Sequence, residues 1–477
     1  MDKGLLAYLL IPLLSAVLIP FAARGRRRLA DVIANVTLLA GLANLAWLVL
    51  RPSMISGGFA DIPGDGFTLL LVGTVYLVGF CVTFFSAWFM EDGAPNRQAY
   101  YSLILVSVAA MTGVVSATDF FTLYVFIEVL AVTSFALITT DDSGRGVEGA
   151  LKYFFLTFPA SALIILGISI LMLTLGSLSF DNLRIFMASG IPSSGPVTFG
   201  AALMLLGFLI KSGVAPFHTW TPDAYQGAYA PVSAHLAGIV TKISGVYAVI
   251  RMAALLRFFD GRALALSDLL MFLGMLSIAV GAVAALRQKD FKRMLAFSSV
   301  SQVGYIVLAA GLGTPLAIMG AIFHLFNHAT FKTVLFLNSA SLEKSAGTTD
   351  MEKLGGMEHA MPWTSWTSVV ALLSTAGVPP LSGFWSKLLI IIALWQAGLR
   401  TYAVLALLFS IVTLAYFMVM QRKVFFGKRS RAAEVSTEVP APMLAPAVLM
   451  SALIVALGLL FPYFYTYVRM VAERILI

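Results

Sequence analysis

Apolar runs of about 20 residues recur along this chain from one end to the other, and they constrain its fold more than any other feature. A helix of about 20 apolar residues crosses roughly 30 Å of hydrocarbon, and a soluble domain does not carry many such runs. The composition agrees, because 60% of the 477 residues are hydrophobic and only 11% are charged. The sequence therefore predicts an all-α, polytopic membrane protein and excludes the soluble enzyme classes.

About fourteen transmembrane helices are predicted from these runs. The first seven lie near 4–23, 29–50, 67–89, 100–117, 119–139, 151–175 and 196–217. The second seven lie near 231–256, 266–286, 291–312, 314–341, 363–398, 402–425 and 442–468.

Clusters of Lys and Arg predict the orientation in the membrane. When the arginine-rich loop 24–28 is placed inside, the basic loops 287–293 and 422–431 fall on the same side, as the positive-inside rule requires. We therefore expect a multi-pass protein of a prokaryotic inner membrane, in contact with the lipid bilayer and with both termini outside. Because the net charge of +8 serves this orientation, no nucleic-acid partner is expected.

Two predicted spans contain sequence that breaks a helix. The seventh runs through Lys211-Ser-Gly-Val-Ala-Pro-Phe-His218, and the twelfth through Gly377-Val-Pro-Pro-Leu-Ser-Gly383. Proline lacks a backbone donor and clashes with the preceding turn. Broken backbone at membrane depth is tolerated only where it lines a cavity or is buried in protein. We predict that helices 7 and 12 are broken within the membrane.

The positions of the breaks predict an internal repeat. Spans four to eight and spans nine to thirteen each contain a break in the fourth member, and an odd number of spans forces the second copy to insert upside down. Inverted repeats of this kind are typical of transporters. The triplet Thr118-Asp119-Phe120 also recurs in part as Lys289-Asp290-Phe291. The predicted organisation is an N-terminal three-helix segment, two inverted five-helix repeats and a C-terminal helix, over 1–99, 100–257, 258–425 and 426–477.

Several ionisable residues interrupt the apolar spans, although each charge at the bilayer centre costs roughly 2.5–3.5 kcal/mol on insertion scales. Glu128 is the only acid in the run of the fifth span, and Lys211 is the only base in the apolar run that precedes the first break. We expect these two to pair, and taken alone such a pair suits a structural role as well as a functional one. In the eighth span His235 and Lys242 lie seven residues apart on one helical face.

The eleventh span carries a polar stripe, because His324, His328 and Lys332 follow one another at intervals of four residues. Two histidines at this spacing can bind a metal, but no acidic third ligand lies nearby and Lys332 would repel a cation, so no metal is expected. Satisfied interhelical hydrogen bonds are the alternative role for the stripe. With the residue that follows the second break, the ionisable groups form a predicted proton relay: Glu128, Lys211, Lys242, His324, His328, Lys332 and Lys387.

A relay of this kind follows from how burial and charge act on a lysine. A desolvated lysine releases its proton easily, whereas a nearby carboxylate retains the proton. Moving Glu128 away from Lys211 would therefore drive the lysine proton towards Lys242. No cofactor is expected, because the chain has a single cysteine, Cys81, and neither a dinucleotide fingerprint nor a P-loop.

The same segments resemble a known family. The stretch from Lys211 to His235, followed by 241–251, resembles the signature of the antiporter-like, proton-translocating subunits shared by respiratory complex I, Mrp-type Na+/H+ antiporters and membrane-bound hydrogenases. The segments 288–302, 323–332 and 379–387 resemble the same family, so the resemblance covers roughly 100–400. In the eighth span the sequence is closer to the Mrp D-type and hydrogenase branches than to the N-type subunit of complex I.

The resemblance implies the fourteen-helix fold and a role for each group. It makes Glu128 the fifth-helix glutamate, Lys211 the seventh-helix lysine, Lys242 the connecting lysine and Lys387 the terminal group, with His324 and His328 as the eleventh-helix histidines. It further implies a subunit that moves protons within a multisubunit complex, beside other membrane subunits and a redox module or Na+/H+ antiport machinery. Gln302 stands where some members carry a histidine.

Two alternatives stay open at this point. The chain could be a secondary cation/proton antiporter that works alone, or a structural membrane scaffold without transport of its own. The first alternative predicts transport by the purified subunit, and the second predicts that neutralising Lys211 or Lys242 leaves transport intact. No redox chemistry is expected in the chain itself, whichever complex contains it.

Overall fold

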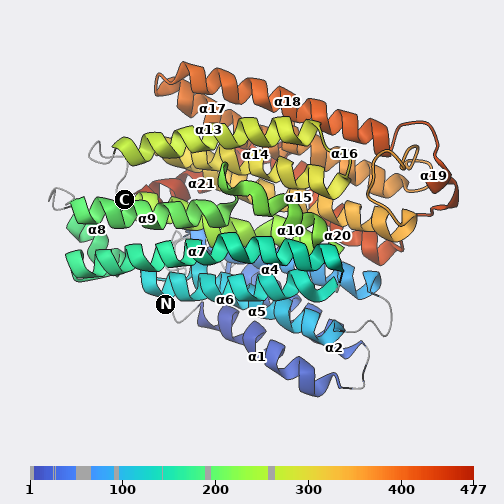
Figure 1. Ribbon diagram of the computed structural model, residues 1–477, viewed down its shortest axis with the longest axis horizontal. Helices are drawn as coiled ribbons and strands as arrows, with labels where there is room; N and C mark the ends of the chain where they lie inside the picture. Colours follow the sequence, from blue (N-terminus) through green and yellow to red (C-terminus); the bar gives the residue numbers. More distant parts are fainter. Residues whose placement is uncertain are drawn as a thin grey trace.

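The computed structural model describes residues 5–24, 26, 28–49, 66–90, 96–141, 143–188, 195–255 and 264–476. Regular structure within these residues is helical, and the only strand-like pairs among them are two isolated β-bridges. The helices run side by side along the long axis of the molecule (Figure 1). The predicted all-α fold is confirmed, because eleven helical segments of the described residues are long and apolar enough to cross a membrane.

Most predicted spans correspond to one continuous helix. Those before the first break are α1 (Leu6–Ala22), α2 (Leu29–Val49), α4 (Gly66–Phe89), α5 (Arg97–Val115), α6 (Phe120–Ile138), α7 (Gly144–Leu175) and α9 (Gly195–Ser212). Those after it are α13 (Leu264–Leu286), α14 (Phe291–Leu312), α15 (Pro315–Ala346), α18 (Arg400–Val424) and α20 (Ala441–Leu459).

The seventh and twelfth spans are broken where the sequence predicts. After α9 and a short turn, the seventh span resumes as η3 (Phe217–Thr219) and α10 (Trp220–Gly227), and the twelfth is divided into α16 (Pro362–Ala376) and α17 (Ser382–Gln396). Gly213 and Gly377 follow directly after α9 and α16 with φ angles of +69° and +83°. Such angles favour glycine. Pro216 lies three residues after Gly213, and Pro380 lies three residues after Gly377.

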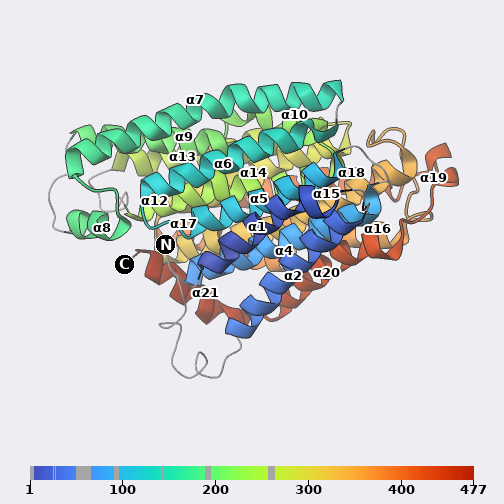
Figure 2. The ribbon, with the colours of Figure 1, turned by 90° about the horizontal axis from the view of Figure 1, so that it is seen from below.

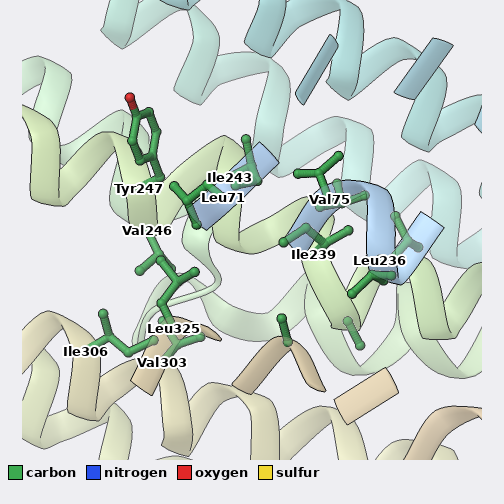
Figure 3. Packing of buried hydrophobic residues seen from close by; sticks show 14 of the residues in the cluster. Leu71, Val75, Leu236, Ile239, Ile243, Val246, Tyr247, Val303, Ile306 and Leu325 are labelled. Carbon is green, nitrogen blue, oxygen red and sulfur yellow. The ribbon is translucent and has the colours of Figure 1, made fainter. Parts of the chain in front are cut away.

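The eighth span has a geometry that the sequence did not predict. It consists of α11 (Ala230–His235), two π-helical segments, η4 (Leu236–Val240) and η5 (Lys242–Tyr247), and α12 (Ala248–Leu255). Apolar side chains of α4 pack against the π segments from one side and those of α14 and α15 from the other (Figure 3). π-helical turns inside helices are frequent at functional sites. Nearly every residue of this span is buried inside the bundle.

The first two helices of the predicted repeats correspond at an offset of 171 residues: α6 and α14 start at this offset, and α7 and α15 both start and end at it. Asp119 and Asp290 cap α6 and α14, and the helices α7 and α15 both contain 32 residues. The β-bridges Asp119 to Ser179 and Asp290 to Asp350 keep the same offset. The first bridge adjoins α8 (Phe180–Ala188), and the second lies beside the segment that contacts the end of α18, at the opposite end of the bundle (Figure 1). The two halves are therefore inverted, whereas the domain limits given above stay predictions.

Two boundaries differ from the prediction. Helix α7 begins at Gly144 instead of near 151, because Ser143 caps it and its first turns are polar. The last predicted span, 442–468, is two helices, α20 and α21 (Phe461–Leu476). Pro462 lacks a backbone donor and cannot continue α20, so the chain begins a new helix there.

The bundle has two distinct ends, which we call the α8 end and the α19 end (Figures 1 and 2). The α8 end carries α8, α12 and α21. The α19 end carries α19 (Arg431–Val435) and the basic loops 287–293 and 422–431. Helices α1 and α21 both reach the α8 end, since Leu5, which precedes α1, lines one pocket with Phe180 of α8, and Tyr467 donates a hydrogen bond to the Gly66 carbonyl.

Candidate functional site

An ion pair joins the fifth and seventh spans inside the first repeat. Nζ of Lys211, in the last turn of α9, lies 3.2 Å from Oε1 of Glu128 on α6. The hydroxyl of Ser161 on α7 donates a 2.7 Å hydrogen bond to the same carboxylate oxygen. The Lys211 side chain is only 3% exposed, whereas that of Glu128 is 29% exposed. The acid therefore has freedom to move that the lysine lacks.

The end of α9 is pressed against the second π-helical segment. A Cβ atom on Gly245 of η5 would lie 2.5 Å from the backbone nitrogen of Ser212 and 2.3 Å from its hydroxyl oxygen. Only glycine allows this approach, because real Cβ atoms do not come so close to backbone. The close packing brings the helix that carries Lys211 against the segment that carries Lys242.

Lys242 is fully buried at the start of η5. Its ammonium group donates to the carbonyl of Ala237 in the preceding π turn and lies 3.2 Å from the Thr241 hydroxyl. Among the ion pairs of the described residues, none includes Lys242. His235, on the same span, places Nε2 2.9 Å from the hydroxyl of Ser107 on α5. Both residues thus contact polar atoms of other spans or turns rather than each other.

The predicted stripe on α15 is fully buried and contacts two neighbouring helices. Nδ1 of His324 lies 2.9 Å from the Ser386 hydroxyl of α17. Lys332 donates to the Ser298 hydroxyl of α14 at 2.6 Å and to a backbone carbonyl of the same helix at 3.0 Å. The ring of His328 lies between them in sequence, 6.5 Å from the His324 ring, and neither of its nitrogens has a partner among the described residues.

Lys387 lies on α17 just beyond the second break. Its ammonium group is 3.3 Å from the Ser410 hydroxyl of α18, which in turn donates to the carbonyl of Ala376 at the end of α16. The same group lies 4.6 Å from the centre of the Tyr305 ring, within range of a cation–π interaction. The break, the lysine and α18 are therefore joined by one set of contacts.

The seven predicted residues lie on neighbouring elements, but among the described residues only Glu128 and Lys211 of this set form a direct polar contact with each other. Buried polar atoms with no described partner occur beside the stripe and the second break, where buried polar groups are normally satisfied by protein or ordered water. They belong to Gln302, His324, Asn327, His328 and Ser382.

Sequence reasoning missed the hydroxyl partners and one charged cluster. Asp223 of α10 lies 2.8 Å from the Lys152 ammonium of α7 and also accepts from Arg293 of α14, so it ties the broken helix to both repeats. Asp223 lies within the stretch from Lys211 to His235 that carries the family resemblance, and this position could have identified it as a site residue. The offset of 171 residues also relates Ser161 to Lys332, which marks Ser161 as a site position. The described residues contain no group of three or more His, Cys, Asp or Glu placed to hold a metal.

A bundle of inverted helical repeats, with two broken helices and buried basic groups at the breaks, defines a membrane protein built for ion transport. The model of the family "NADH:quinone oxidoreductase/Mrp antiporter, TM" matches residues 117–413. The chain belongs to this family, and it is an antiporter-like membrane subunit of the kind found in complex I, Mrp and related complexes.

Individual relatives support this assignment along most of the chain. The protein is 31% identical to the D-type subunit of the Na(+)/H(+) antiporter of Alkalihalophilus pseudofirmus, over 86% of this chain and 83% of that one. It is 31% identical to the N-type subunit of the NADH-quinone oxidoreductase of Desulforudis audaxviator, over 82% and 80%. A chain in the structure of the Mrp complex from Dietzia sp. DQ12-45-1b matches with a TM-score of 0.89 and 25% identity, over 99% and 97%.

Proposed function

We propose that this subunit translocates protons through its seven predicted relay residues. One observation carries the proposal: a partly exposed carboxylate pairs with a buried lysine in the first repeat, and fully buried lysines and histidines continue from there into the second repeat. Uncompensated charges in a membrane core are costly, and they mark ion and proton pathways. The alternative of a structural scaffold offers no reason for the four buried relay lysines on four spans.

The ion pair is the proposed switch. A carboxylate beside a buried lysine favours the charged lysine, and burial without a carboxylate favours the neutral one. Glu128 can turn away while the Ser161 hydroxyl still donates to it, and Lys211 then loses the partner that retains its proton. The proton moves to Lys242, whose segment packs directly against the end of α9.

From Lys242 the proposed route crosses to α15, which packs against η4 and α11. It continues along Lys332, His328 and His324 to Lys387, because α15 also packs against α17 and the Ser386 hydroxyl contacts His324. Water bound to the buried polar atoms without described partners would bridge the gaps between these groups. The second break supplies backbone carbonyls for the same purpose.

Other membrane subunits of the same complex are partners of this chain, and we propose that one of them covers Glu128. The outer face of α6 exposes the apolar residues Val125, Val129 and Val132 beside this partly exposed acid. A carboxylate facing hydrocarbon would cost several kcal/mol, so a protein neighbour with polar groups suits this face better than lipid. Movement of that neighbour would couple a redox module or Na+ antiport to the switch.

We further propose that the α19 end faces the inside of a prokaryotic inner membrane and that both termini are outside. The basic loops at this end support it through the positive-inside rule. Single cysteines in place of Arg26 and Arg429 should react with an impermeant reagent only after the cells are opened. Labelling of either position in intact cells would reverse the orientation.

The relay is tested in the whole complex, reconstituted into vesicles. Lys242→Met and Lys332→Met should each remove most proton pumping while the complex stays assembled. Lys353→Met is the matched control, because the Lys353 side chain is 72% exposed at the surface, and it should pump normally. Normal pumping by both buried-lysine variants would favour the scaffold. Cation/proton exchange by the purified subunit alone would favour the stand-alone antiporter.

A further inference from the structure

The terminal lysine of the proposed relay lies against an aromatic ring instead of an acid. Nζ of Lys387 is 4.6 Å from the centre of the Tyr305 ring of α14, and both side chains are buried. No ion pair among the described residues includes Lys387. The face of an aromatic ring is negative, and it attracts a cation most strongly where water is excluded. The ring is therefore placed to stabilise the charged form of Lys387.

Helix α18 contacts both the ring and the lysine. The Tyr305 hydroxyl donates to the carbonyl of Ala406 at 2.7 Å, which fixes the orientation of the ring. One turn further along α18, the Ser410 hydroxyl lies 3.3 Å from the Lys387 ammonium group and donates to the carbonyl of Ala376. A single turn of α18 thus holds the two partners of this cation–π contact in place.

The ionisable groups that α15 presents to Lys387 are all bases. Three of them lie within electrostatic reach: His324, His328 and Lys332. A positive charge on any of them opposes a charge on Lys387. Tyr305 is the titratable group of α14 that faces the lysine, and α18 contributes the Ser410 hydroxyl and, beside Tyr305, the Tyr416 side chain. Helices α16 and α20 also pack against α17, and they contain no titratable residue.

The first repeat has the opposite arrangement. The position 171 residues before Tyr305 is Ser134 of α6, whose hydroxyl donates to a backbone carbonyl of its own helix. The buried lysine of that repeat, Lys211, has the Glu128 carboxylate at 3.2 Å. The first repeat therefore has an acid and no ring at this position, whereas the second has a ring and no acid paired with Lys387. A ring tied to α18 keeps its place, so its effect on the lysine is constant.

We propose that Tyr305 is a positioning residue of the relay, whose ring takes the place of an acid and sets the pH at which Lys387 releases its proton. This inference rests on the proposed relay and adds a residue that does not itself carry the proton. The centre of the His324 ring lies 5.9 Å from that of Tyr305, so the tyrosine adjoins the last step of the route. Without the negative face the charged lysine is less stable, and it keeps its proton only at lower pH.

Fluorination of the ring tests the proposal without removing the ring. The whole complex is prepared with phenylalanine or with mono-, di- or trifluorophenylalanine in place of Tyr305, and proton pumping into vesicles is measured against pH. Each fluorine withdraws electron density from the face of the ring. The alkaline limb of the profile should move to lower pH in steps, by roughly one pH unit in total, which is the size of a desolvated cation–π interaction.

Phe120 provides the matched control for the fluorine series. It is fully buried at the start of α6 against Phe180, and among the described residues no Lys or Arg is placed over its ring. The same fluorinated residues at this position should leave the alkaline limb where it is. A limb that moves equally with fluorination at Phe120 would show a general effect of fluorine and would overturn the proposal.

Ordinary substitutions separate the ring from its hydroxyl. Tyr305→Phe keeps the ring and loses the hydrogen bond to Ala406, so its alkaline limb should stay close to the native one. Tyr305→Leu removes the ring and should move the limb at least as far as the trifluorinated ring does. An unchanged limb throughout the fluorine series would overturn the proposal, and so would a shift in Tyr305→Phe as large as that in Tyr305→Leu.

The Lys387→Glu background identifies the group on which the ring acts. The ring does not stabilise a carboxylate, so fluorination should not move the pH profile of the remaining transport to lower pH. A shift of the same size in this background would assign the ring to His324 and contradict the proposal. Failure of the relay looks different, because Lys387→Ala would then pump fully. If Lys387→Ala blocks pumping while fluorination at Tyr305 has no effect, only the role of the ring is wrong.

Discussion

The two inverted repeats use one scaffold for different chemistry. In the first repeat a partly exposed acid, Glu128, pairs with Lys211 at 3.2 Å. In the second repeat Lys332 and Lys387 contact hydroxyls, a backbone carbonyl and aromatic rings, and no ion pair among the described residues includes either of them. A lysine with a movable acid can be switched between charge states, whereas a lysine beside neutral dipoles can only pass on what arrives.

The offset of 171 residues shows where the difference arises. It relates Glu128 to Ser299 and Ser161 to Lys332, so an acid and a hydroxyl in the first repeat correspond to a hydroxyl and a base in the second. The backbone positions are equivalent, but the charges are not. We infer that the first repeat is the switch of the proposed relay and the second repeat is its conducting half.

The largest expected effect comes from removing the switch. Glu128→Gln and Lys211→Met should each lower proton pumping by about tenfold or more, because the lysine can no longer be driven between charge states, and one pKa unit corresponds to a factor of ten. Pumping by the reconstituted complex is the measurement. Ser299→Ala, at the corresponding position of the second repeat, should keep most of the activity.

The same variants can show whether the Glu128–Lys211 pair is a switch or a structural ion pair. If Glu128→Gln prevents assembly and the combination with Lys211→Met restores it, the pair is a structural ion pair, because only an unpaired buried charge would then be harmful. The two repeats would in that case differ in packing rather than in mechanism.

The next effect is expected at the far end of the second repeat. Lys387→Ala should block transport, because it removes the group beside the second break, whereas Lys387→Glu should retain some, because a carboxylate can also exchange protons with water there. Proton uptake by vesicles that contain each variant distinguishes the two. Full and equal activity in both would remove Lys387 from the pathway.

An intermediate effect is expected at the junction of the repeats. His328→Ala should slow transport severalfold while lowering the thermal unfolding temperature only slightly, because neither ring nitrogen has a described protein partner to lose. Turnover and unfolding temperature are measured on the same preparation. A large loss of stability with unchanged turnover per assembled complex would assign His328 to packing.

The smallest effect concerns the packing of α7 against α10 in the first repeat and of α15 against α17 in the second. A Cβ on Gly149 of α7 would lie 2.7 Å from the backbone oxygen of Asp223, whereas one on Gly320 of α15 would lie 2.7 Å from a side-chain carbon of Ile390 and 3.1 Å from its backbone nitrogen. Because a side chain can yield and backbone cannot, Gly149→Ala should destabilise by about 1–3 kcal/mol and Gly320→Ala by less. Thermal unfolding compares them, and Gly144→Ala, with no neighbour within 4 Å, is the control. The reverse order would mean that the second repeat is the more rigid one.

Much of the fold could be predicted from the sequence because the bilayer imposes local rules. A span needs about 20 apolar residues, and both breaks were predicted where glycine and proline together interrupt such a run, at Pro216 and at Pro380. The partial recurrence of Thr118-Asp119-Phe120 was the visible trace of a capping residue that starts α6 and α14 alike. The π-helical segments had no such signal, since their sequence is compatible with an ordinary helix.

The membrane class, the broken spans and the ionisable groups could be predicted from the sequence, since each depends on residues close together in the chain, and the inverted repeat could be predicted from the order of the spans and their breaks. Which of these groups contact one another depends on the tertiary fold. It brings Lys211 to Glu128 and Ser161, gives Lys242 no acidic partner among the described residues, and places Arg251 against the rings of Phe67 and Tyr247. Contacts between spans depend on how helices rotate and pack against one another, and no local pattern of residues specifies that.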